Sequence, residues 1–273
     1  MLAGHSAMQD AVIGPAPLTW TRRVAAAGVK RFHPPALTAS TQGTRVQCQP
    51  SEKKEIAPVP RKPAPPAEDS QQVRDLLRKY ACPVPYHEVR TRFLGNIATP
   101  KLSASPLNLA KRLWGGEFPE VEAIEDLNRL IDILINGLWN ALTIHQKRSE
   151  PFRLVKVPVE PSVANLARLA LVRRQELDGF VEGLFDGADE IDLPEKANAS
   201  LGILAETRAI MAGAHDLATR SVEPAEPAEI QETFRHLREL TRIMEKEINA
   251  VVLDCARARR QMIRDVTARP TFH

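Results

Sequence analysis

The sequence predicts an all-α protein, a multi-helix bundle with a long C-terminal heptad helix and a disordered N-terminal tail. Two observations support this fold class. Beyond the tail, apolar side chains recur every three or four residues, the spacing of one face of an α-helix. These segments begin at serines and prolines that typically start helices, and they end at glycines and prolines that typically stop them. The chain divides into a tail over residues 1–67, a helical domain over 68–221 and a long helix over 222–273.

The tail is rich in proline and basic. It holds ten of the 22 prolines and nine basic against three acidic residues, a net charge of +6. Because the whole chain carries +3, residues 68–273 carry −3, so the basic character gives no evidence that the folded part binds nucleic acid. Residues 58–67 (PVPRKPAPPA) are typical of a stiff, solvated polyproline-II linker. The first 50 residues also share the composition of a mitochondrial transit peptide, and that alternative stays open.

Three short helices open the helical domain. The first is expected over 70–80, because the Cys-Pro-Val-Pro sequence of residues 82–85 stops it. The second fits 86–97. Ser105, followed by a proline, forms a good N-cap and N1 pair, and it begins a helix that two glycines end after residue 114.

The most apolar helix is expected over 119–146, as the central buried helix of the bundle. Four polar residues, Asn128, Asp132, Asn136 and Asn140, lie one turn apart in it and form one stripe. This stripe is interpreted either as a recognition surface or polar groove, or as a solvated face or hydrogen-bonded seam between helices.

An extended segment and two more helices follow. Residues 152–161 alternate like a strand but contain two prolines, so we expect an edge strand or an extended connector. Ser162 caps a helix that runs toward residue 185, and residues 223–229 form a hinge after the next helix. That next helix, over 195–219, carries the apolar residues Leu201, Leu204, Ile210, Met211 and Leu217.

The last helix, expected over residues 226–265, has the most regular period, a heptad seam from Ile230 to Met262. A helix of this length measures roughly 60 Å, so its seam must pack along its own bundle or against a second chain. One interpretation is a homodimer through this helix. Thr241, Cys255 and Ala258 weaken the seam, which favours packing within the chain or a modest dimer. The residues predicted to mediate self-association are Ile230, Phe234, Leu237, Met244, Ile248 and Val251.

Gly179, Gly183 and Gly187 are spaced four residues apart, in the sequence DGFVEGLFDG. No strand precedes them and their spacing differs from that of a phosphate-binding loop. At helical spacing they lie on one face and allow another helix backbone to approach closely. We therefore predict that all three pack against a neighbouring helix.

No catalytic, metal or cofactor signature is present. The acidic group of Asp186, Asp189, Glu190 and Asp192 lacks the order of an EF-hand loop. The seven histidines are dispersed, and the three cysteines are too far apart for a zinc site or a disulfide framework. We expect no cofactor and no enzymatic activity, and the cysteine content favours the cytoplasm. The most apolar run, 130–142, is too short and too polar to span a membrane.

Two passages, Phe93–Leu142 and Glu176–Glu206, resemble the YecA/YgfB-like family of uncharacterised bacterial proteins, and the resemblance extends over about residues 86–219. It implies an all-α fold and no established chemistry. The sequence departs from the family at Leu177, where tryptophan is common, and it lacks the cysteine-rich zinc tail of some members, so the resemblance implies no metal. The matching residues are Leu94-Gly95, Pro100, Trp114-Gly115-Gly116 and Gly179-Phe180-Val181-Glu182-Gly183.

These features together predict a non-enzymatic helical protein that binds a protein partner or regulates one, with no membrane contact. The alternative is a nucleic-acid-associated regulator. It would use the basic tail together with the arginine cluster at the end of the last helix, Arg257, Arg259, Arg260 and Arg264.

Overall fold

The structure is a computed structural model that describes residues 67–157, 160–220 and 226–267. In these ranges it is helical and contains no β-strand, as the sequence predicts. The predicted tail, apart from its last residue, and residues 223–225 of the predicted hinge lie outside the described residues. The helices are α2 (Ala67–Lys79), α3 (Tyr86–Ala98), α4 (Pro106–Arg112), α5 (Ile124–Ile131), α6 (Asn140–Leu142), α7 (Val163–Phe185), α8 (Glu195–Arg220) and α9 (Pro227–Thr267), with a π-helix η1 (Asp132–Trp139) and a 3-10 helix η2 (Thr143–Gln146).

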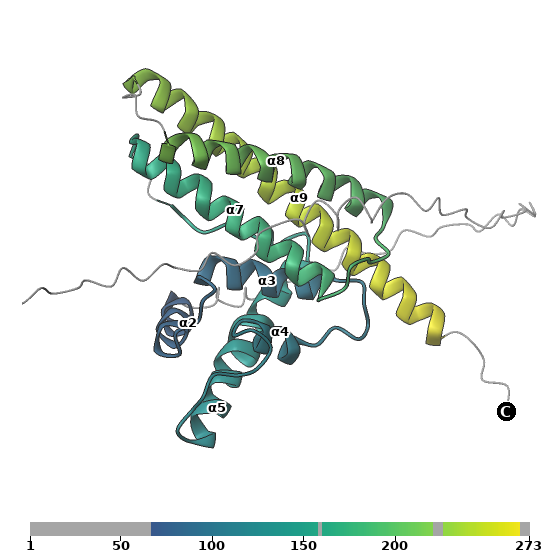
Figure 1. Cartoon of the computed structure of the whole chain (residues 1–273). Helices are drawn as coiled ribbons and strands as arrows, with labels where there is room; N and C mark the ends of the chain where they lie inside the picture. The colour runs from purple at the N-terminus through teal and green to yellow at the C-terminus, as the bar shows by residue number, and fades with distance from the viewer. Residues whose placement is uncertain (1–66, 158–159, 221–225, 268–273) are drawn as a thin grey trace, which may run out of the picture.

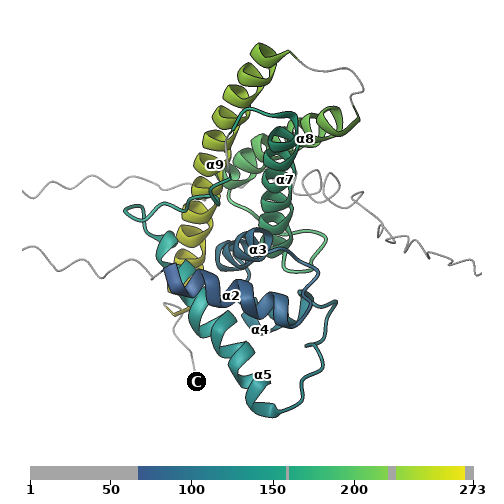
Figure 2. The same cartoon turned by 90° about the vertical axis from the view of Figure 1, so that its left-hand side faces the viewer.

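The long helices α7, α8 and α9 lie side by side, and α3 packs beneath α7 (Figure 1). The shorter helices α2, α4 and α5 gather on the other side of α3 (Figure 2). One continuous hydrophobic core joins all of these helices. Because the buried residues of α9 belong to that core, the predicted segments 68–221 and 222–273 share one hydrophobic core.

Helices α4 and α7 begin where the sequence predicts. The Ser105 hydroxyl accepts a hydrogen bond from the Asn108 amide (3.3 Å), and the Ser162 hydroxyl accepts one from the Asn165 amide (3.2 Å). Each serine thereby satisfies one of the amides that the first turn of a helix leaves without a partner.

Helices α3 and α7 form the centre of the fold, and their backbones touch. A Cβ atom at Gly179 would lie 2.5 Å from the Glu88 carbonyl oxygen. A Cβ atom at Gly183 would collide with the Arg92 carbonyl oxygen, and one at Gly95 would collide with the Phe180 carbonyl oxygen. Only glycine fits at these three positions, and the close approach buries the large side chains beside them, such as Phe93.

Gly187 does not take part in this contact, so the prediction that it lies on one helix face with Gly179 and Gly183 against a neighbouring backbone is wrong; a Cβ atom there would lie 2.6 Å from the side chain of Arg112 on α4. Helix α7 ends at Phe185, and Gly187 lies beyond that end with φ +76°. Asp186, with φ +49°, caps the helix, and its carboxylate accepts hydrogen bonds from Asn96 and Arg112. Gly187 therefore serves the left-handed chain turn that terminates the helix.

The predicted central helix over 119–146 is also wrong in position and form. It begins at Ile124, which is 62% exposed, and it lies at the flank of the bundle (Figure 2). Residues 132–139 are π-helical, and the segment ends in the 3-10 helix η2. Its core contact is confined to one side, whereas the glycine contacts let α3 and α7 occupy the centre.

Helix α9 buries its heptad seam within its own chain. Phe234, Leu237, Met244, Ile248 and Val251 are all buried against the other helices, and Ile230 is partly buried. The prediction that this seam forms a dimer interface is therefore wrong, and the alternative of packing within the chain is confirmed. Residues 261–265 of α9 are exposed, and the end of this helix projects beyond the bundle (Figure 1).

No helix in the described ranges is long and apolar enough to span a bilayer.

Candidate protein-binding surface

The polar stripe predicted as a recognition surface faces solvent. Asn128, Asp132, Asn136 and Asn140 are all exposed, and the Asn136 amide donates a hydrogen bond to the Asp132 carboxylate (2.8 Å). Asp132 and Asn136 line a shallow depression of about 260 Å³ between α2 and η1, whereas Asn128 and Asn140 lie outside it. Only two of the four stripe residues therefore line the depression, and Asp132 supplies the one carboxylate of its lining.

A second depression, of about 270 Å³, lies between α7 and α9 and includes Arg173, Arg242 and Glu245 in its lining. Arg173 pairs with Glu176, Arg242 with Glu239 and Glu245 with Arg153. These three charges are thus compensated by ion pairs within the protein, and the lining also contains Arg238.

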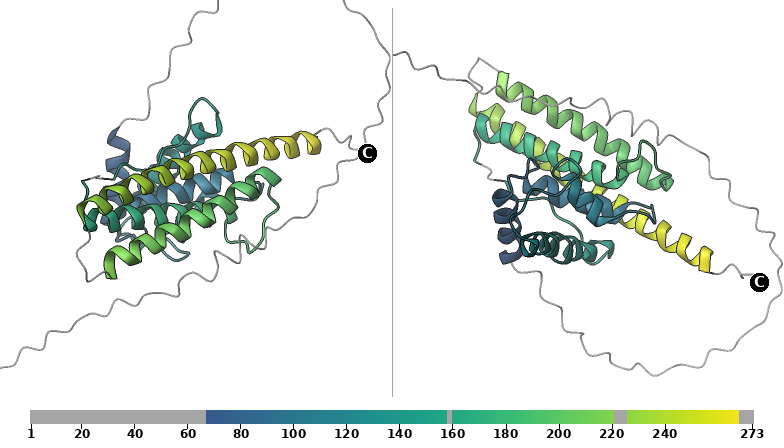
Figure 3. Two further views of the ribbon diagram at one scale, coloured as in Figure 1. Left: turned by 90° about the horizontal axis from the view of Figure 1, so that it is seen from above. Right: turned by 60° about the horizontal axis from the view of Figure 1, so that its bottom comes forward.

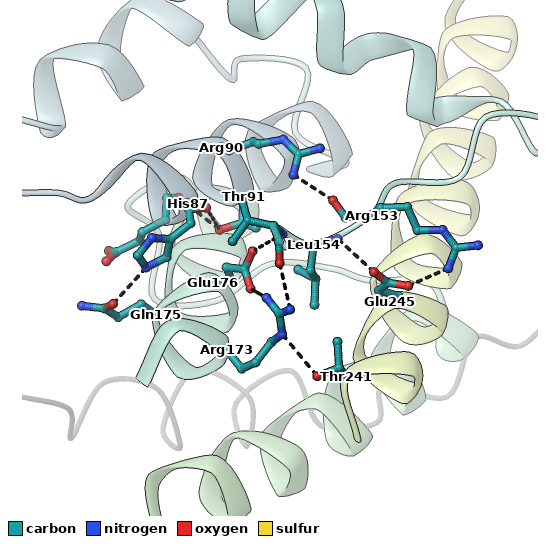
Figure 4. A network of polar contacts seen from close by, with 12 residues as sticks. His87, Arg90, Thr91, Arg153, Leu154, Arg173, Gln175, Glu176, Thr241 and Glu245 are labelled. Carbon is teal, nitrogen blue, oxygen red and sulfur yellow. Dashed lines mark hydrogen bonds and ion pairs between the residues drawn. The ribbon is translucent and has the colours of Figure 1, made fainter. Parts of the chain in front are cut away.

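The segment over residues 151–157 is an extended connector, which confirms one of the two sequence expectations. Its backbone groups bond to side chains of the surrounding helices (Figure 4). The Asn249 amide group accepts from the Phe152 N–H (2.7 Å) and donates to the Phe152 carbonyl (3.0 Å). The Leu154 N–H donates to Glu245 (3.0 Å), and the Val155 N–H donates to Glu176 (2.9 Å). Side chains therefore replace the ladder that a neighbouring strand would supply.

Arg173 and Glu176 form the buried part of this network, one turn apart on α7 (Figure 4). Arg173 also donates to the Val155 carbonyl (2.9 Å) and to the Thr241 hydroxyl (3.2 Å). Burial raises the pKa of Glu176 above its ordinary value, against the opposing effects of Arg173 and the Val155 amide. The pair is held entirely by protein groups, which is the arrangement of a structural ion pair.

Two partly buried histidines have structural partners as well. His87 Nε2 contacts the Gln175 side-chain oxygen (2.9 Å), and His145 Nδ1 contacts the Glu150 carbonyl (2.8 Å). Burial lowers the pKa of both side chains, so both are neutral near pH 7. Burial also raises the pKa of the Cys255 thiol to about 12, which makes it a poor nucleophile.

The arginine cluster predicted as a nucleic-acid contact is partly used inside the fold. Arg257 pairs with Asp254 (2.9 Å). Arg259 donates to the Thr99 carbonyl (3.3 Å) and to the Gln146 side chain (2.8 Å), and it thereby attaches α9 to the end of α3 and to η2. One of the four arginines, Arg259, thus holds the helix in place, while Arg257 pairs within α9 itself.

Helix α8 presents the most unusual surface, which the sequence did not single out. Its inner face is buried through residues such as Leu201, Leu204 and Met211. Its outer face also carries large apolar side chains, with Ile203 at 41%, Ile210 at 50% and Leu217 at 74% exposure. A helix that is apolar on opposite faces is usually covered on both. Here α8 lies along one edge of the bundle, with its neighbours α7 and α9 on one side (Figure 3).

The three exposed side chains are aligned. They are spaced seven residues apart, and a straight α-helix drifts by about 20° per heptad, so they form one row along α8. Single exposed apolar residues are ordinary, but an aligned row of them is typical of a binding face. We define the outer face of α8 by Ile203, Ile210 and Leu217 with the polar and small residues beside them.

No group of three or more His, Cys, Asp or Glu side chains is placed to hold a metal ion in the described part of the chain. Comparison with known proteins gives no further indication of function. No protein-family model, no curated protein and no solved structure matches the chain. The resemblance to the YecA/YgfB-like family therefore stays a prediction from its sequence motifs.

Proposed function

We propose that this chain is a non-enzymatic, cytoplasmic protein-binding protein that recognises its partner through the outer face of α8. The observation that supports the proposal is the row of Ile203, Ile210 and Leu217 on a helix whose opposite face already forms core. Burying the exposed part of such side chains would contribute roughly 1–2 kcal/mol each, enough to anchor a helical partner.

The proposal agrees with the structural roles of the buried and partly buried polar side chains. Arg173, Glu176 and Glu245 hold the connector, and both histidines described above contact amide or carbonyl oxygens. Binding of nucleic acid through α9 is less favoured, because Arg257 and Arg259 already have partners within the fold.

Substituting Ile210→Glu tests the proposal. The charge would lie in the middle of the binding row, so we expect the partner to be lost, while an exposed position leaves folding unchanged within about 0.5 kcal/mol. The measurement is sedimentation of the fluorescently labelled full chain in an extract of its native cells. The wild-type chain should sediment as a complex larger than its own 30.3 kDa, and the variant should lose that complex.

Ile263→Glu is the matched control. Ile263 is an isoleucine of α9 with 47% exposure, close to the 50% of Ile210, and it lies away from α8. It should leave the complex intact. Equal sedimentation of the wild-type chain and the Ile210→Glu variant would rule out the outer face of α8 as the binding surface.

A further inference from the structure

We propose that the partner of the outer face of α8 is the same face of a second copy of this chain, with the two α8 helices antiparallel. This inference rests on the proposed function of α8 as a binding surface. It follows from the order of residues in two adjacent rows of that face.

The first row is apolar and consists of Ile203, Ile210 and Leu217. The second row lies three residues further along and consists of Glu206, Gly213 and Arg220, all exposed. Two rows with seven-residue spacing that are offset by three residues occupy the a and d positions of a heptad. This is the pattern by which one helix packs against another along its length.

The charged residues of the second row complement the same row of an identical helix that runs in the opposite direction. Glu206 and Arg220 stand at equal distances on either side of Gly213. In an antiparallel pair, Glu206 of each copy lies beside Arg220 of the other, whereas a parallel pair would place like charges together. Neither side chain has an ion-pair partner among the residues that the structure describes. The arrangement is that of a two-fold interface in which the same surface is used twice.

The shape of the face agrees with this pairing. The pairing of Glu206 with Arg220 of the second copy places the two Gly213 residues against each other, with Ile210 of each copy within one turn of that point. A Cβ atom at Gly213 would have no neighbour within 4 Å, unlike one at Gly95, Gly179 or Gly183. An exposed glycine within a helix lowers helix stability by about 1 kcal/mol relative to alanine. Close approach of a second helix would explain why glycine stands at position 213.

The contact is short, which sets its strength. From Ile203 to Arg220 the face extends about 26 Å along the helix. A single helix pair of this length covers less surface than the ~800 Å² per partner of a typical stable interface. We therefore expect a reversible dimer with a dissociation constant on the order of 10 µM.

Charge reversal with the purified full chain tests the inference by sedimentation equilibrium. Glu206→Arg and Arg220→Glu each place like charges at both ends of the interface, and each should raise the dissociation constant roughly tenfold or more. An equimolar mixture of the two variants should restore dimerisation, because each altered residue then meets its opposite charge. The double variant E206R/R220E should restore it as well. Both positions are exposed, and circular dichroism would verify that each variant keeps its helical fold.

A monomeric wild-type chain at about 100 µM, ten times the expected dissociation constant, would overturn the inference. Dimerisation that neither single variant weakens, or that the mixture fails to restore, would overturn it too. If the purified chain is monomeric while Ile210→Glu still removes a complex in the native extract, the second copy is wrong and the proposed function stands. If Ile210→Glu changes neither measurement, both are wrong.

Discussion

Substituting Gly183→Ala is expected to lower the free energy of unfolding by about 2–3 kcal/mol. The added Cβ would collide with the backbone carbonyl of Arg92, and a backbone atom cannot rotate away as a side chain can. Helices α3 and α7 would have to separate, which costs more than the roughly 1 kcal/mol that alanine gains over glycine in helix propensity. Denaturant unfolding of the full chain measures this difference.

Gly202→Ala provides the matched control. Gly202 also lies within a helix, but a Cβ atom added there would have no neighbour within 4 Å. At this position the same substitution should raise the free energy of unfolding by up to about 1 kcal/mol. Equal effects at the two positions would show that helix propensity alone explains both, and that α3 and α7 do not approach as closely as described.

Removal of Glu176 is expected to have a still larger effect. Glu176→Ala would leave the buried Arg173 guanidinium without its counter-charge and the Val155 N–H without its acceptor. Loss of one partner from a buried ion pair costs about 3–5 kcal/mol. Glu176→Gln should cost less, because the amide oxygen can still accept from Val155. Unfolding in denaturant would give both values.

The control for this prediction is the pair of Glu239 and Arg242 on α9. Its residues have the same spacing of three, but both side chains are exposed. Glu239→Ala should change the free energy of unfolding by less than about 0.5 kcal/mol. A comparably small loss for Glu176→Ala would mean that the connector is not held by the buried pair.

The beginnings and ends of several helices could be predicted because their signals are local. Ser105 and Ser162 need only the amides three residues ahead of them to act as caps. The proline pair after α2 likewise acts on its own neighbourhood. Such signals give the number of helices and the all-α class, but they carry no information about which helices meet.

The centre of the fold could not be predicted for that reason. Gly95 contacts Phe180 and Leu184, which lie far along the chain, and nothing in its local sequence shows that approach. Apolar content alone favoured the segment 119–146, yet backbone contact between α3 and α7 determined the centre. The π-helix within that segment also has no signature in the apolar spacing.

The candidate surface escapes prediction because its residues look like core. Ile210 and Leu217 belong to the apolar residues of their helix, and the pattern cannot tell which of two apolar faces the fold will cover. In contrast, the regular seam of α9 suggests a second chain, while the fold itself covers that seam with α7 and α8. Burial decides between these cases, and burial depends on tertiary packing.

The most direct test of the central claim is photo-crosslinking in the native cell from a benzophenone amino acid at position 210, with position 239 on α9 as the exposed control. If the outer face of α8 binds protein, irradiation should produce a crosslinked protein band from position 210 and none from position 239. Absence of such a band from position 210, or equal bands from both positions, would contradict the claim.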